Sequence, residues 1–125
     1  MPTVLVVDDE DDIRYVVRRM IERMQGNIPE VHEASTGEDA IEAWRVHRHD
    51  VIILDQRMPG ISGFETARRI LAEEPSQPII LFTAFRDDGE DDGFVADAVA
   101  ARVPKSQLHR LPAELDLLLA GRDGS

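Results

Sequence analysis

Five short apolar runs divide the chain at regular intervals. The strongest are Thr3–Val7, Val51–Leu54 and Ile79–Phe82, and the weaker ones are Pro29–Ala34 and Ala98–Val103. Several of them are continuous rather than alternating, which is typical of strands buried on both faces of a parallel sheet. The pattern therefore predicts five strands, and the proline that opens the second run suits an edge strand.

The segments between these runs carry apolar residues at the three- and four-residue spacing of amphipathic helices. Ser35, with Glu38 three residues later, predicts a capping box at the start of one helix. Pro112 suits the first turn of the last helix. We expect helices over residues 11–25, 35–47, 63–74 (entered through Gly60–Gly63), 94–101 and 112–120.

Strands that alternate with helices indicate an α/β fold of the (βα)₅ kind, with right-handed crossovers and helices on both faces of a parallel sheet. We predict a doubly wound, flavodoxin-like sheet of strand order 2-1-3-4-5, in which strands 1 and 3 are neighbours. We expect one domain over residues 1–121 and a flexible C-terminal tail over residues 122–125.

Polar side chains follow four of the predicted strands at the points where the strands end. Asp8 and Asp9 follow the first strand, Asp55 the third, Thr83 the fourth, and Lys105 lies just after the fifth. In an open α/β sheet, ligands bind outside the carboxyl ends of the strands. The sequence therefore predicts that these five residues form one site.

Composition narrows the classes of function. A chain of 125 residues with 42% hydrophobic content suits one domain with a single core. The formal charge of −11 disfavours direct contact with nucleic acid, and the lack of cysteine excludes disulfides and thiolate metal sites. No run suggests a signal peptide or a membrane span, so we expect a cytoplasmic domain without membrane contact.

The predicted cluster of carboxylates favours phosphoryl chemistry. Three neighbouring carboxylates repel one another, and oxygen ligands without histidine or cysteine suit Mg²⁺, or Mn²⁺ in its place. One aspartate is then able to act as a nucleophile and form an aspartyl phosphate. Lys105 would neutralise one phosphoryl oxygen and Thr83 would donate a hydrogen bond to another.

Each of these residues also has an ordinary structural interpretation. Asp8 and Asp9 could belong to a solvated loop that caps a helix, Asp55 to a turn, and Lys105 to the exposed surface. The coincidence of all of them at strand ends is what favours a site. The four histidines show no ligand spacing in the sequence, and we interpret them as surface or packing residues: His32, His47, His49 and His109.

The same residues carry a family resemblance. The sequence resembles the receiver domain of two-component response regulators, with the chemotaxis-type receiver fold, over nearly its whole length. The matching motifs are Val-Val-Asp8-Asp9-Glu, Ile-Leu-Asp55-Gln-Arg-Met-Pro with Gly63, Thr83-Ala84, and Lys105.

The resemblance implies a role for each matched position. Asp55 would accept a phosphoryl group from a histidine kinase or a histidine phosphotransfer protein. Asp9, Asp55 and the backbone carbonyl of Arg57 would bind Mg²⁺ directly, and Asp8 would bind it through a water. The phosphoryl group would be held by three further residues: Thr83, Ala84 and Lys105.

Such a protein is a switch and not an enzyme on an external substrate, since it catalyses only its own phosphorylation and dephosphorylation. The resemblance places binding of an output partner on the face of the fourth helix, fifth strand and fifth helix. Two other functions stay open: a Mg²⁺-dependent phosphohydrolase or phosphotransferase, and a non-phosphorylated pseudo-receiver scaffold. The cognate kinase, the output and a homodimer formed on phosphorylation stay open as well.

The chain departs from the family pattern at the expected switch. Arg102 stands three residues before the lysine, where receivers usually carry tyrosine or phenylalanine, and Pro104-Lys105-Ser106 replaces the usual Lys-Pro step. We expect the switch to work through new ion pairs of Arg102 or to bypass this position. Arg57 and Phe85 occupy positions that tune the phosphoryl lifetime in the family, and their bulk predicts slow self-dephosphorylation.

Overall fold

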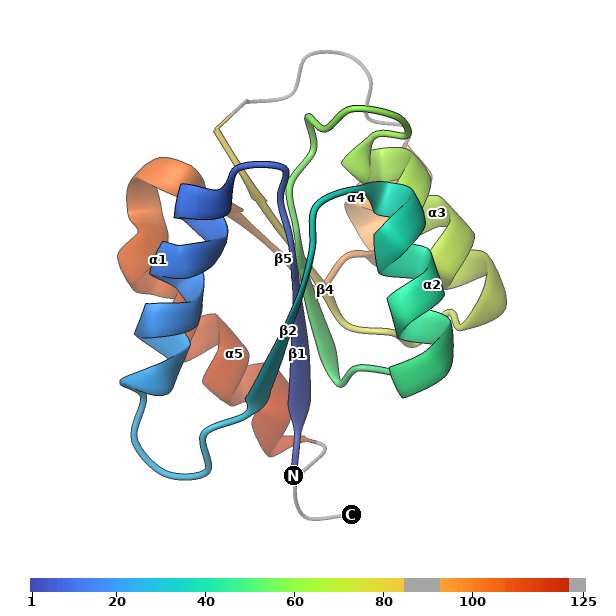
Figure 1. Cartoon of the computed structure of the whole chain (residues 1–125). Coiled ribbons are helices and arrows are strands. Elements are labelled where there is room, and N and C mark those ends of the chain that lie inside the picture. Colours follow the sequence, from blue (N-terminus) through green and yellow to red (C-terminus); the bar gives the residue numbers. More distant parts are fainter. Residues whose placement is uncertain (85–92, 122–125) are drawn as a thin grey trace.

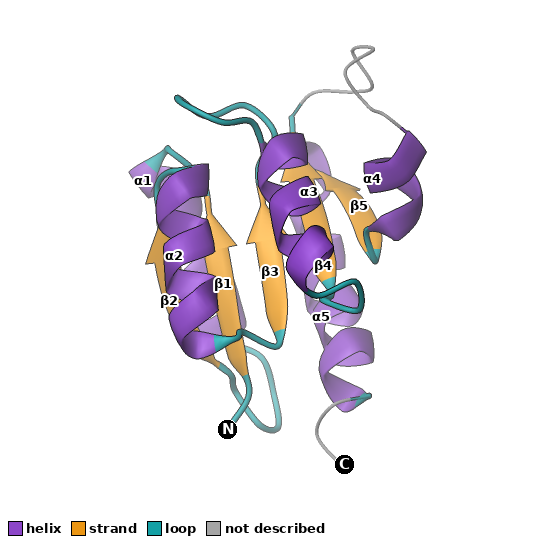
Figure 2. Ribbon diagram, turned by 90° about the vertical axis from the view of Figure 1, so that its right-hand side faces the viewer, coloured by secondary structure: helices purple, strands orange, loops and turns teal. Residues whose placement is uncertain are grey.

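A computed structural model describes residues 1–84 and 93–121 of the chain as a parallel sheet between two layers of helices (Figures 1 and 2). The strand order is β2-β1-β3-β4-β5, which confirms the predicted doubly wound sheet. The strands are β1 (Thr3–Val7), β2 (Glu30–Ala34), β3 (Val51–Leu54), β4 (Ile79–Thr83) and β5 (Ala101–Pro104). The helices are α1 (Asp11–Glu22), α2 (Gly37–His47), α3 (Gly63–Glu73), α4 (Gly93–Ala98), the 3₁₀ helix η1 (Lys105–Arg110) and α5 (Leu111–Ala120).

The sheet separates two apolar cores. Successive residues of a strand point to opposite faces, so Val4 and Val6 of β1 pack under α1 and α5, and Leu5 and Val7 pack under α2 and α3. Figure 1 shows α1 and α5 on one side of the sheet and α2, α3 and α4 on the other. The continuous apolar runs of β1 and β3 are buried on both faces, as the sequence predicted.

The strand register brings the polar strand ends together. Val7 of β1 pairs with Leu54 of β3, so the residues that follow these two strands leave the sheet side by side. Thr83 of β4 pairs with Pro104 of β5, and Lys105 comes next. The carboxyl edge of the sheet is therefore the place where the predicted site residues converge.

Two predicted helix boundaries are wrong by a few residues. The cap of α2 is Thr36, whose hydroxyl oxygen accepts a hydrogen bond from Asp39 N at 3.0 Å, and not Ser35 with Glu38. Because β2 continues to Ala34, the extended backbone that a cap requires falls at Thr36. Helix α1 ends at Glu22 and not at residue 25, since its last turn closes at Arg23.

The region around β5 differs most from the prediction. The sequence suggested a helix over residues 94–101 that overlapped a strand over Ala98–Val103. In the structure α4 ends at Ala98, and Ala100 N donates a hydrogen bond to Ile79 O at 2.8 Å, which starts the pairing of β5 with β4. The 3₁₀ helix after β5 was not predicted, and it joins α5 at Leu111, one residue before the predicted start.

Three histidines that belong to different elements of the fold lie together beside the edge strand β2. His32 of β2, His47 at the end of α2 and His49 before β3 have their ring centroids 4.6 to 5.6 Å apart. His49 is fully buried, and its Nδ1 has no hydrogen-bond partner among the described residues. Burial, together with the neighbouring His32 and His47, lowers the pKa of His49 to about 4.

No helix in the described part of the chain is long and apolar enough to cross a membrane.

Because the pKa of His49 is lowered in the fold, we expect the free energy of unfolding to decrease at acidic pH. In the unfolded chain this histidine takes up a proton near its ordinary pKa of 6.5, whereas in the fold it does so near 4. Its contribution to the free energy of unfolding is therefore complete above pH 6.5 and is lost as the pH falls to about 4, a loss of about 3 kcal/mol.

Urea unfolding in EDTA between pH 7.5 and 4 measures this loss. A His49→Gln variant, which cannot titrate at this position, should show a shallower pH dependence than the wild type over that interval. His109→Gln changes an exposed histidine outside the cluster and should keep the wild-type dependence. Equal slopes for wild type and His49→Gln would contradict the assignment.

Candidate functional site

Two buried carboxylates occupy the carboxyl ends of neighbouring strands. Asp8 is 2% exposed and Asp55 is 5% exposed. Their backbones continue the sheet, because Asp8 N donates to Ala34 O at 3.1 Å and Asp55 N donates to Val7 O at 3.0 Å. Asp9, the next residue after Asp8, is exposed. The sheet therefore fixes two acids rigidly and places a third at the opening of the site.

The three acids form one cluster. One carboxylate oxygen from each of Asp8, Asp9 and Asp55 lies within 4.8 Å of those of the other two. Asp8 Oδ1 accepts a hydrogen bond from Glu10 N at 2.9 Å, and Asp55 Oδ1 accepts one from Gln56 N at 2.8 Å. These backbone donors orient both carboxyl groups, so that their second oxygens face the interior of the site.

Lys105 lies between the two buried carboxylates. Its Nζ is 2.8 Å from Asp8 Oδ2 and 3.3 Å from Asp55 Oδ2, and Glu10 Oε2 lies farther away at 3.8 Å. The side chain is only 15% exposed. Because Lys105 follows β5 directly and begins η1, the sheet sets the point from which its flexible stem reaches the acids.

The single ammonium group does not offset the negative charge of the site. Burial raises the pKa of Asp55, and the charge of Asp8 adds to this, while Lys105 acts in the opposite direction. Burial also opposes the charge of Lys105, but its contacts with Asp8 and Asp55 prevail and raise its pKa. Lys105 therefore stays protonated, but its single positive charge does not compensate both buried carboxylates. A second cation at the site would offset the remaining negative charge.

The donor set fits a hard divalent cation. Every candidate ligand in the cluster is a carboxylate oxygen, the ligand type that Mg²⁺ prefers. Asp8 Oδ2 accepts no hydrogen bond of good geometry among the described residues, although the ammonium of Lys105 lies beside it. The exposed Asp9 adds a third oxygen at the solvent side, where a hydrated ion would enter.

Gln56 is a site residue that the sequence reasoning missed. It is buried directly after Asp55, and its Oε1 accepts a hydrogen bond from Phe64 N at 2.8 Å, while Gln56 O accepts one from Gly63 N at 2.9 Å. A Cβ atom at Gly63 would overlap the carbonyl oxygen of Asp55. The start of α3 is therefore packed directly against the backbone of Asp55. In the sequence, the signal for this contact is the polar Gln56 directly after Asp55.

The remaining predicted residues lie around this centre. Thr83 is half-buried at the end of β4, Ala84 follows it exposed, and the exposed Arg57 lies two residues after Asp55. The guanidinium carbon of Arg102 of β5 lies 5.6 Å from the ring centroid of Phe64. Phe85 lies outside the described residues.

Known proteins of one family match this chain. The family model of the response regulator receiver domain matches residues 4–106. The transcriptional regulatory protein AfsQ1 of Streptomyces coelicolor is 40% identical over 112 residues, which is 82% of this chain and 48% of that protein. The response regulator UvrY of Escherichia coli is 40% identical over 88 residues, which is 70% of this chain and 40% of that protein. The chain thus spans less than half the length of these two relatives.

Solved structures agree with the sequence matches. The response regulator TrrA of Thermotoga maritima, in complex with Mg²⁺ and BeF, has a TM-score of 0.83 and 34% identity, over 94% of this chain and 99% of TrrA. TrrA in complex with the histidine kinase ThkA gives a TM-score of 0.81 and 33% identity, over 95% and 99% of the two chains.

The family model covers most of the chain, solved structures at more than 30% identity match its fold, and an acid cluster lies at the carboxyl edge of the sheet. The chain belongs to the family of response regulator receiver domains of two-component signalling.

Proposed function

We propose that Asp55 is the phosphoacceptor of this receiver, and that its phosphorylation by a histidine kinase or a histidine phosphotransfer protein switches the binding of a partner. The observation that carries the proposal is the environment of the Asp55 carboxylate. It is buried and oriented by Gln56 N, and it is flanked by two further acids and by the ammonium of Lys105.

The transfer moves one phosphoryl group between two nucleophiles. An oxygen of the Asp55 carboxylate forms a bond to phosphorus while the bond from phosphorus to the donor imidazole nitrogen breaks, and the imidazole leaves with that electron pair. Asp55 Oδ2 is the attacking oxygen in this proposal, because Oδ1 accepts the hydrogen bond of Gln56 N.

The other site residues bind the transferred group. Bound Mg²⁺ supplies positive charge that shields the phosphoryl oxygens from the acids. Asp9, Asp55 and the carbonyl of Arg57 would hold the ion, with Asp8 acting through a water. Lys105, already 3.3 Å from Asp55 Oδ2, would move its ammonium onto a phosphoryl oxygen. Thr83 and the backbone of Ala84, at the end of the neighbouring strand β4, would donate hydrogen bonds to the others.

The partners follow from the same proposal. The solved complex of TrrA with ThkA is a histidine kinase bound to a receiver of this fold, which supports a kinase as phosphodonor here. The output partner would bind the face of α4, β5 and α5, next to Thr83 and Lys105. A homodimer formed through this face on phosphorylation is one form that the output could take. Arg57 and Phe85 would slow the loss of the phosphoryl group.

Arg102 would report the state of Asp55 through the start of α3. Gln56 contacts Phe64 by its side chain, and Arg102 lies over the ring of Phe64. A shift of the loop after Asp55 would therefore move the ring on which the guanidinium rests. A cation held over an aromatic face is worth about 0.5–1 kcal/mol at an exposed site, enough to bias two positions of a flexible side chain.

Replacement of the acceptor tests the central step. Incubation of wild type with Mg²⁺ and acetyl phosphate should add one phosphoryl group, as measured by intact mass, and Asp55→Asn should add none. Asp12→Asn, which changes an exposed aspartate of α1, is the matched control and should behave as wild type. A phosphoryl group on Asp55→Asn would contradict the proposal. So would wild type that neither gains mass nor releases phosphate.

Replacement of the exposed acid tests the metal role. Asp9→Asn removes one charged oxygen without disturbing a buried group, and we expect it to weaken Mg²⁺ binding about tenfold or more. The shifts of backbone amide signals during titration with MgCl₂ measure the affinity. Asp12→Asn should leave it unchanged. Equal affinities for Asp9→Asn and wild type would remove Asp9 from the metal site.

Replacement of Arg102 separates phosphorylation from the switch. Arg102→Gln should be phosphorylated at the wild-type rate, within about twofold, because Lys105 supplies the positive charge beside Asp8 and Asp55. The phosphorylation-induced changes in amide signals of β4, β5 and α3 should become smaller, since the cation over Phe64 is lost. If these changes are the same size in both proteins, the switch bypasses Arg102.

A further inference from the structure

The cluster of His32, His47 and His49 lies apart from the phosphorylation site and takes no part in the function proposed above. We propose that these three histidines form a site for a divalent transition-metal ion of the Zn²⁺ or Ni²⁺ type. Imidazole nitrogen is a preferred ligand of such ions, whereas the carboxylate cluster around Asp55 suits Mg²⁺. The proposal does not depend on phosphorylation of Asp55.

The spacing of the rings matches that of ligands around one ion. With metal–nitrogen bonds of about 2.0–2.1 Å and tetrahedral angles, two imidazole rings on one ion have centroids about 5 Å apart. The three observed separations are 4.6 Å for His32 and His47, 4.9 Å for His32 and His49, and 5.6 Å for His47 and His49. The backbone therefore brings the three rings near one another. Among the described residues, only Asp8, Asp9 and Asp55 already hold one ligand atom each within 4.8 Å of the others, so binding at the histidines requires the ring of His47 to turn.

Two of the ligand nitrogens already face each other. His32 Nδ1 lies 2.8 Å from His49 Nε2, so one of these nitrogens donates its N–H to the other. Two nitrogens on one tetrahedral ion are about 3.4 Å apart, so an ion between them requires a small outward movement of both rings. In the metal-bound form the N–H of His32 would be on Nε2, beside Glu30 Oε1. His47 is exposed, and turning its ring toward the ion would cost little packing.

Neighbouring groups support a cation at this place. A histidine that binds a metal commonly donates its other N–H to a carboxylate. His32 Nε2 lies 3.6 Å from Glu30 Oε1, on the side opposite to the nitrogen that faces His49. The proposed ligands are thus His32 Nδ1, His49 Nε2 and one nitrogen of His47, with a fourth position for water.

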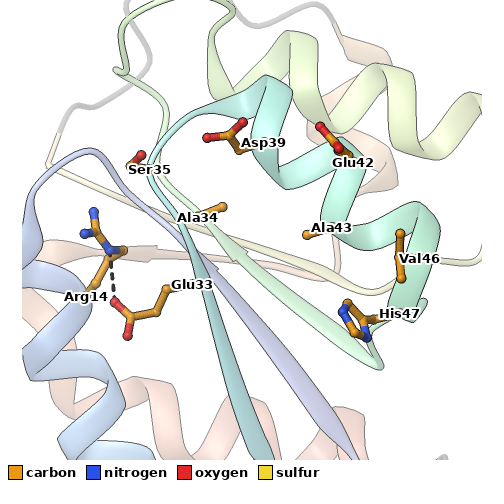
Figure 3. A pocket seen from close by; sticks show the side chains of 9 residues that line it. All are labelled: Arg14, Glu33, Ala34, Ser35, Asp39, Glu42, Ala43, Val46 and His47. Atoms are coloured by element: carbon orange, nitrogen blue, oxygen red, sulfur yellow. Dashed lines mark hydrogen bonds and ion pairs between the residues drawn. The ribbon is translucent and has the colours of Figure 1, made fainter.

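The site has an open and acidic approach. Figure 3 shows His47 at one end of a groove between β2 and α2, with Glu33, Asp39 and Glu42 along the same groove. Arg14, which also lines it, is paired with Glu33. Together with the net charge of −11, these carboxylates would raise the local concentration of cations.

The histidine cluster and the acid cluster lie at opposite ends of the same strand. His49 comes just before β3 and Asp55 just after it, so the four residues of the strand separate them by roughly 13 Å or more. A metal at the histidines would tie the end of α2 to β2 and β3 without contact with the phosphorylation site. Two ions of different chemistry are therefore able to bind independently.

Calorimetric titration of the metal-free protein with ZnCl₂ tests the proposal. The buffer contains saturating MgCl₂, which occupies the carboxylate cluster. Wild type should bind one Zn²⁺, and His47→Ala, which changes an exposed side chain, should bind it at least about tenfold more weakly. His109→Ala changes the remaining histidine of the chain and should match wild type, and so should Asp55→Asn.

A second measurement identifies the ligands. The ring nitrogen signals of His32, His47 and His49 should shift in the nuclear magnetic resonance spectrum on addition of one equivalent of Zn²⁺, and those of His109 should not. The proposal is overturned if wild type binds no Zn²⁺, or if His47→Ala and His109→Ala bind it with the same affinity. Loss of binding in Asp55→Asn would place the Zn²⁺ in the carboxylate cluster and overturn it as well.

Discussion

The ion pairs of Lys105 with Asp8 and Asp55 are the interaction on which the site depends. Two carboxylates that are almost fully buried would repel each other strongly without a cation between them. Lys105 supplies one positive charge at 2.8 Å from one acid and 3.3 Å from the other. The net charge that remains is negative, which suits the site to a divalent cation.

The sheet holds the two buried acids in fixed positions. The backbones of Asp8 and Asp55 hydrogen-bond to the ends of β2 and β1, so neither acid is able to retreat from the other. Lys105 is different, since it begins a 3₁₀ helix after the edge strand β5 and reaches the acids by a flexible side chain. Rigid acids and a movable cation suit a switch. A phosphoryl group on Asp55 would draw the ammonium of Lys105 to a new partner, while the backbones of Asp8 and Asp55 would stay in place.

Much of this arrangement could be predicted from the sequence, since polar residues at strand ends converge whenever the strands are parallel. The strand order and the five central residues followed from that rule and from the family resemblance. The cap at Thr36 was not predicted because Ser35 and Thr36 are adjacent and either hydroxyl is able to cap a helix. The end of β2 at Ala34 decides in favour of Thr36. The boundary between α4 and β5 was missed because short alanine- and valine-rich segments suit either structure. The histidine cluster depends on packing of β2 against α2, which no local spacing reveals.

The most direct measurement of the central claim is the chemical identity of the phosphorylated residue in the unaltered chain. Borohydride reduces an aspartyl phosphate to homoserine, which tandem mass spectrometry locates within a peptide. After incubation with Mg²⁺ and acetyl phosphate, we expect homoserine at position 55 and at no other acid. Homoserine at position 8 or 9, or phosphate on a hydroxyl side chain instead, would contradict it.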